Sequence, residues 1–174
     1  MDENLRRVMD RHEIEEVLAR YCRALDRLDR PLLESCFHPD SQHNHSYKGP
    51  SSTFCDFAFE VLSSCVATHH QIGNVSIRVQ GDFAHTDCYF TAYHRLGDPP
   101  PPAFPGAKAG EDVLIGGRYI DRFERRDGVW KIIKRTGVHD WRRYEAAADN
   151  GFYETPVDER GRRNGDDYVY DAEF

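Results

Sequence analysis

The histidines are the side chains of this sequence best suited to proton transfer, and nine of them occur among its 174 residues. His69 and His70 lie in the segment 67–74, whose residues are typical of a strand. Neighbouring side chains on a strand point to opposite faces, so at most one of these two histidines faces the interior. A buried histidine needs a hydrogen-bond partner for each ring nitrogen, because burying an unpaired polar group costs free energy.

Asp26, near the end of the first predicted helix, is an acid that could serve as such a partner. The negative end of the helix dipole disfavours a carboxylate there, so Asp26 needs a compensating partner or solvent. An Asp–His pair is the minimum equipment for general base catalysis, because the carboxylate fixes the imidazole tautomer and stabilises the imidazolium that forms. Spacing alone does not select Asp26 over Asp29, which lies closer to the centre of the apolar stripe. A surface role for Asp26 and a purely structural role for His70 also stay open.

His43 and His45 form an H-x-H pattern, which on a strand places both rings on the same side. A metal site could use such a pair. No carboxylate or third histidine stands at a telling spacing, and a lone H-x-H is a weak signal. The pattern therefore favours a polar loop, and we predict no metal site.

Three helices are predicted in the first third of the chain. Asp10 and Glu13 resemble a capping box, and Pro31 closes the helix that follows. Its apolar stripe is Ile14, Val17, Leu18, Tyr21, Cys22 and Leu25. A short second helix covers Leu32–Phe37. The third begins at Ser51 or Ser52 and buries Phe54, Phe57, Ala58, Val61, Leu62 and Cys65.

Alternating patterns predict strands in the rest of the chain. They cover Gln42–Tyr47, Thr68–Val79, Phe83–Leu96, Val113–Arg125 and Val129–Trp141. The Asp127-Gly128 step between the last two runs indicates a hairpin, and the proline-rich stretch 97–110 must be a long loop. Helices followed by antiparallel strands predict an α+β fold, in which one curved sheet packs against helices and leaves a cavity where the two layers part.

Composition limits the function classes. The net charge is −7 and no basic patch occurs, which argues against a nucleic-acid partner. The sequence has no run of 18 apolar residues and begins with a charged segment, so we expect neither a membrane span nor a signal peptide, and a cytoplasmic location. The five cysteines are predicted to be free thiols. Residues 149–174 hold eight acids and three arginines, which predicts a domain over 1–148 and an acidic tail over 149–174.

Several motifs in the correct order carry a family resemblance over residues 10 to about 142. The series is Tyr21-Cys22-Arg23-Ala24-Leu25-Asp26, then Phe37-His38-Pro39-Asp40, then Thr68-His69-His70 with Gly73-Asn74, and finally the hairpin Arg122–Ile132 with Arg135. On these motifs the chain resembles the SnoaL-like branch of the nuclear-transport-factor-two-like superfamily. The proline-rich loop and the acidic tail are not part of the shared pattern, and either could cover the mouth of a pocket.

The resemblance implies a cone-shaped, mixed but mostly antiparallel sheet wrapped around three helices, with the pocket at the wide end. It also implies no cofactor and a homodimer or homotrimer. The nearest members are acid–base lyases of the scytalone dehydratase, hexachlorocyclohexane dehydrochlorinase and bile-acid dehydratase types. Their aspartate, histidine and tyrosine correspond to Asp26, His70 and Tyr21. A second histidine corresponds to His94, and an arginine of the last strand corresponds to Arg135.

The expected activity is therefore a dehydratase-like elimination on a small carbonyl compound or a hydroxylated aromatic or alicyclic compound. His70 removes the proton, and Tyr21 with His94 binds the oxygen where charge develops. The substrate contacts are expected to come from His94, Arg135, Asn74, Tyr93, Phe54, Phe57, Phe90 and Tyr119. The same dyad suits an isomerase or a polyketide-cyclase-like enzyme. The fold also serves non-catalytic binding modules and the structural subunit of ring-hydroxylating dioxygenases.

Overall fold

Three helices and six strands make up the body of the molecule, for which a computed structural model describes residues 2–148 and 154–171. The helices are α1 (Glu3–Arg27), α2 (Arg30–Ser35) and α3 (Ser51–Ser63). The strands are β1 (Phe37–Asn44), β2 (Lys48–Pro50), β3 (Cys65–Gln80), β4 (Phe83–Leu96), β5 (Asp112–Arg126) and β6 (Val129–Glu145). Two short 3-10 turns, Val157–Glu159 and Tyr168–Tyr170, follow in the tail.

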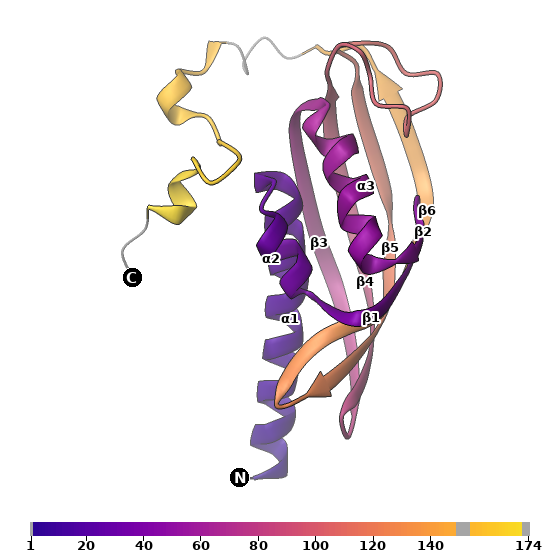
Figure 1. Cartoon of the computed structure of the whole chain (residues 1–174), viewed down its shortest axis with the longest axis vertical. Coiled ribbons are helices and arrows are strands. Elements are labelled where there is room, and N and C mark those ends of the chain that lie inside the picture. The colour runs from indigo at the N-terminus through magenta and orange to yellow at the C-terminus, as the bar shows by residue number, and fades with distance from the viewer. Residues whose placement is uncertain (1, 149–153, 172–174) are drawn as a thin grey trace.

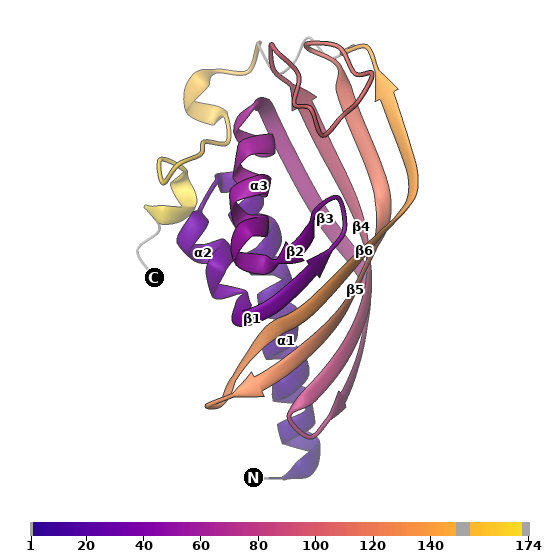
Figure 2. The same cartoon turned by 45° about the vertical axis from the view of Figure 1, so that its right-hand side comes forward.

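All six strands belong to one sheet in the order β2-β1-β6-β5-β4-β3. β1 runs parallel to β6, and every other neighbouring pair is antiparallel. The sheet is not closed, and it curves around the helices (Figures 1 and 2). The predicted α+β fold, with a mixed sheet and three N-terminal helices, is confirmed.

The first helix is longer than the sequence pattern predicts. It begins at Glu3, because the Asp2 side chain caps it by accepting the backbone N–H groups of Asn4 and Leu5. The predicted start at Asp10 is wrong: Asp10 is buried and accepts hydrogen bonds from Arg125 at 2.6 Å and from the Trp130 indole at 3.0 Å. The Asp10 carboxylate therefore bonds to residues far along the chain and does not cap the helix.

The end of α1 and the start of α2 are set by two neighbouring residues. Leu28 adopts a left-handed conformation with φ of 52°, and this ends α1 before Pro31. The Asp29 side chain then caps α2 by accepting the Leu32 N–H at 3.0 Å. This reversal brings the C-terminal turn of α1, which carries Asp26, against β3. The contact between these two elements holds the candidate site.

Most strands agree with their sequence patterns, and β4 has the predicted bounds. The first strand differs most, because the sequence predicts Gln42–Tyr47 whereas β1 begins at Phe37 and ends at Asn44. Its parallel pairing with β6 explains the difference, because this non-local contact begins where Phe37 stands beside Ile132. The alternation of apolar and polar residues along such a short polar segment cannot indicate a pairing with β6.

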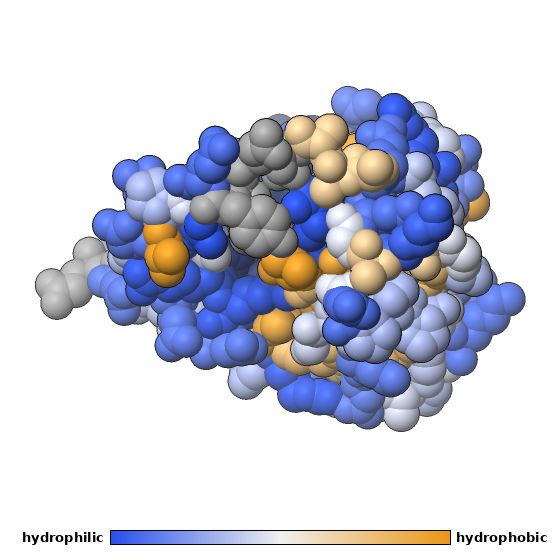
Figure 3. All heavy atoms as spheres, turned by 90° about the horizontal axis from the view of Figure 1, so that it is seen from above, coloured by the Kyte–Doolittle hydropathy of each residue, from blue (hydrophilic) through white to orange (hydrophobic). Residues whose placement is uncertain are grey.

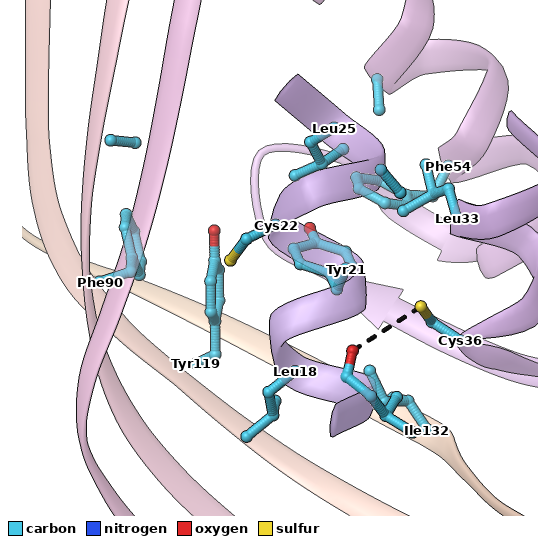
Figure 4. Close-up of a cluster of buried hydrophobic side chains, with 14 of the residues drawn as sticks. Leu18, Tyr21, Cys22, Leu25, Leu33, Cys36, Phe54, Phe90, Tyr119 and Ile132 are labelled. Carbon is cyan, nitrogen blue, oxygen red and sulfur yellow. Dashed lines mark hydrogen bonds between the residues drawn. The ribbon is translucent and has the colours of Figure 1, made fainter. Parts of the chain in front are cut away.

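The core lies between α1, α3 and the concave face of the sheet. Tyr21 packs there between Phe54 and Tyr119, with ring centroids 6.4 and 5.7 Å away (Figure 4). Fully buried aliphatic side chains such as Leu33 and Ile132 complete it, and each contributes about 1.5–3 kcal/mol. The five cysteines are buried free thiols, as predicted.

The described part of the tail, residues 154–171, lies on the side of α1 and α2 (Figures 1 and 2). Arg27 forms an ion pair with Asp167 at 2.8 Å, and the Arg27 carbonyl accepts the Asn164 N–H at 2.8 Å. The Tyr170 hydroxyl donates to Asp29 at 2.8 Å. The predicted boundary between residues 148 and 149 adjoins residues 149–153, which lie outside the described residues. No helix in the described part of the chain is long and apolar enough to span a membrane.

Candidate active site

A cavity of about 90 Å³ lies between the concave face of the sheet, the last turns of α1, and α3. Ala103 and Phe104 of the β4–β5 loop also line it. Figure 3 looks onto this end of the molecule and shows hydrophobic side chains grouped near the centre, bordered by hydrophilic ones. The lining consists of Tyr21, Leu25, His45, Ser46, Phe54, Phe57, Ala58, Val61, Leu62, His70, Phe90, Ala92, His94, Ala103, Phe104, Ile115, Tyr119, His139 and Arg142.

Asp26 binds His70 through both of its carboxylate oxygens. Oδ1 accepts the ring Nδ1–H at 2.7 Å, and Oδ2 accepts the backbone N–H at 2.8 Å. Both side chains are less than one tenth exposed. With a hydrogen on Nδ1, the lone pair of the neutral ring stands on Nε2. Asp29, the sequence alternative, is occupied instead by its capping role at α2.

The ionised form of Asp26 is stabilised by its donors. Burial acts to raise its pKa, but hydrogen bonds from the His70 ring and backbone and from the Thr68 hydroxyl outweigh burial and hold the pKa below the ordinary value. The Thr68 oxygen in turn accepts a hydrogen bond from Arg163 of the tail at 2.9 Å. Arg163 also donates to the carbonyls of Leu62 and Cys65, each at 3.0 Å. Arg163 of the tail thus bonds to Thr68, the residue that helps His70 to keep the pKa of Asp26 low.

His94 meets the His70 ring edge to face, with centroids 5.2 Å apart. Burial, followed by the neighbouring His70, lowers the pKa of His94 to about 3, so the ring is neutral near neutral pH. The Val113 backbone partly opposes this shift, and the buried Nδ1 of His94 has no partner among the described residues. When the neutral ring carries its hydrogen on Nε2, Nδ1 is an acceptor.

Tyr21 lines the cavity beside the dyad, supported from behind by a buried ion pair. Arg135 donates to both carboxylate oxygens of Asp121, at 2.8 and 2.6 Å, and both side chains are fully buried. The guanidinium also stacks on the rings of Tyr21 and Tyr119, at 4.0 and 4.3 Å. Burial raises the pKa of Tyr21 well above its ordinary value, so its hydroxyl keeps its proton.

Five of the eight predicted contact residues line the cavity, and three do not. Phe54, Phe57, Phe90, Tyr119 and His94 form part of the wall. Arg135, Tyr93 and Asn74 lie outside the lining.

Arg135 is neutralised by Asp121 behind Tyr21, outside the cavity lining. Tyr93 alternates with Ala92 and His94 along β4, so it faces away, and its hydroxyl donates to Asp112 at 2.9 Å. Asn74 is exposed at an irregularity of β3 between Gly73 and Ser76, where its φ is 49°.

The structure adds residues to the site that the sequence analysis did not predict. His45, His139 and Arg142 line the cavity at the β1–β6 side, and Arg163 supports the dyad from the tail. The H-x-H pattern drew attention to His45 but gave no partner for it. Arg142 and Arg163 lie in polar surface-like segments, and no local signal distinguishes them from solvated arginines.

The H-x-H pair does not form a metal centre with a third ligand in the part of the chain that the structure describes. The His43 ring instead stacks on Phe54, with centroids 3.6 Å apart and planes within 7°. His45 contacts His139 at 4.6 Å. The two rings of the H-x-H pattern therefore have different neighbours.

The open curved sheet, the three helices and the cavity at one end define a protein with the nuclear-transport-factor-two-like fold. A model of the SnoaL-like domain matches residues 6–136, and the chain belongs to this family. An uncharacterised protein of Mycobacterium tuberculosis (strain H37Rv) is 30% identical over 133 residues, which cover 74% of this chain and 84% of that protein.

Solved structures with the same fold include enzymes. A hexachlorocyclohexane dehydrochlorinase of type 2 has a TM-score of 0.71 at 23% identity, over 86% of this chain and 99% of the other. A candidate scytalone dehydratase from Novosphingobium aromaticivorans has a TM-score of 0.66 at 19% identity, over 83% and 96% of the two chains. At these identities the similarity shows the fold alone.

Proposed function

We propose that this chain is a cofactor-independent lyase of the dehydratase type, in which His70, bound by Asp26, abstracts a proton from carbon. The observation that carries the proposal is the 2.7 Å bond between Asp26 and the His70 Nδ1 at the wall of an apolar cavity. The dehydrochlorinase and the candidate scytalone dehydratase are named for eliminations, and they share the fold.

His70 acts as the base through Nε2, which carries the lone pair when Nδ1–H is bound to Asp26. The carboxylate stabilises the imidazolium that forms when the substrate proton arrives. Because hydrogen bonds from His70 and Thr68 hold the pKa of Asp26 low, Asp26 stays ionised throughout. General base assistance of this kind is worth roughly 10²–10⁴ in rate.

Tyr21 is the hydrogen-bond donor to the substrate oxygen where negative charge develops. Its raised pKa keeps the hydroxyl protonated, and the Arg135 guanidinium against its ring favours polarisation of that hydroxyl toward the oxygen. The neutral His94 accepts a hydrogen bond from a substrate hydroxyl through Nδ1. The proton that His70 collects is then available to the departing hydroxyl, which leaves as water.

The test compares Asp26→Asn with Asp29→Asn. Purified variants are given β-hydroxycarbonyl compounds and hydroxylated aromatic compounds in D₂O. NMR then follows alkene formation and deuterium uptake beside the carbonyl, the latter detecting isomerisation as well. We expect D26N to lose about 10²–10⁴ in rate. D29N removes the same charge three residues away and keeps a side-chain oxygen that can cap α2, so it should change stability little.

Equal rates in D26N and wild type would refute the role of Asp26. Loss of activity in both variants with unchanged folding would also count against it, because Asp29 does not touch His70. If the wild-type protein binds these compounds without chemistry or deuterium exchange, the chain is a binding module and the proposed function is wrong.

A further inference from the structure

The cavity has a second polar group on the side away from the dyad. We call His45, His139 and Arg142 the distal end, and Asp26, His70 and His94 the acid–base end. His45 directly follows β1, and His139 and Arg142 lie on the neighbouring β6. His70 is on β3, the opposite edge strand of the six-stranded sheet. The curvature of the sheet brings both ends to one cavity.

His45 is held at the distal end by close packing. Its ring contacts Tyr119 at 5.8 Å and His139 at 4.6 Å. Gly137 makes this position possible, because a Cβ at that residue would overlap the His45 ring. The buried Nε2 of His45 has no partner among the described residues. A buried polar atom without a partner is costly, so this nitrogen is suited to a ligand.

Arg142 supplies positive charge at the same end. In the described part of the chain no carboxylate lies within ion-pair distance of it, and it bonds to the Tyr144 hydroxyl at 3.3 Å. The neighbouring Arg143, by contrast, forms an ion pair with Glu145. A half-buried cation on a cavity wall without an acid partner favours an anionic group of a ligand.

The wall between the two ends is apolar and aromatic. It is formed by Phe54, Phe57, Phe90, Phe104, Ile115 and Tyr119. A ligand that contacts both ends therefore has an apolar, ring-sized body with polar groups at opposite ends. The acid–base end offers an acceptor at His94 Nδ1 and a donor at Tyr21, and the distal end offers a cation and a ring nitrogen.

We propose that the substrate is an aromatic or alicyclic carboxylic acid, whose carboxylate is bound by Arg142 and the His45 Nε2–H. The carbon that loses its proton then lies at His70, and this part rests on the proposed function. The neutral His45 ring can carry its hydrogen on Nε2 and donate it to the carboxylate. Arg142 supplies the charge-assisted bond that distinguishes an acid from a neutral analogue of the same shape.

The test measures the affinity of two probes of equal shape, cinnamate and cinnamamide, by isothermal titration calorimetry. Wild type, Arg142→Gln and Arg143→Gln are compared. We expect wild type to prefer cinnamate by about tenfold or more, the usual effect of a hydrogen bond to a charged group. R142Q should abolish this preference and leave cinnamamide binding unchanged. R143Q removes the same charge from the adjacent residue and should keep the preference. His45→Gln should weaken cinnamate less than R142Q does.

Equal affinity of wild type for the two probes would overturn the proposal, and so would a preference that survives in R142Q. Failure of wild type to bind cinnamate at millimolar concentration would also overturn it. Asp26→Asn separates this test from the proposed function. It should bind cinnamate as wild type does even though it lacks turnover, so a failed activity assay leaves the anion preference measurable.

Discussion

Two pairs of histidines line the cavity, and they differ in whether a carboxylate bonds to one of the rings. His70 and His94 meet edge to face at 5.2 Å, and His45 and His139 do so at 4.6 Å. Asp26 binds the ring of His70, whereas no carboxylate bonds to either ring of the second pair among residues 2–148 and 154–171. The same side chain is therefore equipped as a base at one end of the cavity and as a neutral polar contact at the other.

The carboxylate reaches His70 because of how α1 ends. The left-handed Leu28 terminates the helix within two residues of Asp26, and the last turn packs on β3. Burial of a carboxylate at this negative helix end is offset by three donors, from the His70 backbone, the His70 ring and Thr68. The neighbours of each ring, and not the ring itself, therefore distinguish the two pairs.

The largest expected effect is a difference in turnover rate between variants of the two histidine pairs. His70→Gln removes the base and should lower turnover by about 10²–10⁴. His45→Gln removes a substrate contact, so it should raise KM and change kcat by less than about tenfold. Steady-state kinetics of both variants checks this. Equal losses of kcat would show that the two ends are not functionally distinct.

A second prediction concerns acid stability. Burial, and then the charge on His139, lowers the pKa of His45 to about 3. Burial, and then the charge on His70, lowers the pKa of His94 to about 3. The unfolded chain binds these protons near pH 6.5 and the folded chain does not. Folding stability therefore falls as the pH decreases from about 6.5 toward 3. At about pH 5 each ring accounts for a loss of about 2 kcal/mol.

Urea denaturation at about pH 7.5 and pH 5 measures this loss. The free energy of unfolding should change less between these two pH values in H45Q than in wild type. The reduction should equal the contribution of one ring, because glutamine does not titrate. An identical pH dependence in wild type and H45Q would show that the His45 ring takes up its proton in the folded protein.

The smallest expected effect tests the support of the acid–base end by the tail. Arg163→Gln should slow proton abstraction by about tenfold or less, because Thr68 loses the donor that orients its hydroxyl toward Asp26. The acid limb of the pH–rate profile should move to higher pH, since an Asp26 carboxylate with a weaker Thr68 bond attracts the proton on the His70 ring more strongly. A purely structural role would lower stability and leave this limb in place.

Arg162→Gln is the matched control, because the Arg162 guanidinium bonds to Tyr168 within the tail. In a Thr68→Val background, R163Q should have no further effect on the acid limb. A shift of equal size in R162Q, or an additional shift in the double variant, would contradict the chain from Arg163 through Thr68.

Much of the fold follows from local patterns, as β4 illustrates: its alternation from Phe83 to Leu96 gives both bounds. The start of α1 could not be predicted in this way. Asp10 looks like a cap locally, and its partners Arg125 and Trp130 are more than a hundred residues away. Contacts between distant segments decide such positions, and a periodic pattern does not contain them.

The candidate site likewise has residues that the sequence predicts and residues that only the tertiary structure brings together. Asp26, Tyr21 and His70 stand at positions that a family motif marks. Tyr21 and His70 line the cavity, and Asp26 binds the His70 ring. The distal end and Arg163 come from tertiary proximity across the sheet and from the tail, so no spacing reveals them. Asn74 was misassigned because an irregularity in β3 turns it outward, and a strand register cannot be read from one sequence.

The most direct test of the acid–base assignment is the tautomer of His70, observed by ¹⁵N NMR of the ring nitrogens at mildly alkaline pH in wild type and D26N. We predict Nδ1–H with a bare Nε2 in wild type, because Asp26 accepts both the ring and backbone N–H groups. An asparagine has one acceptor oxygen, which the backbone N–H takes, so its NH₂ faces Nδ1 and the hydrogen moves to Nε2. The same tautomer in both proteins, or Nε2–H in wild type, would contradict the account.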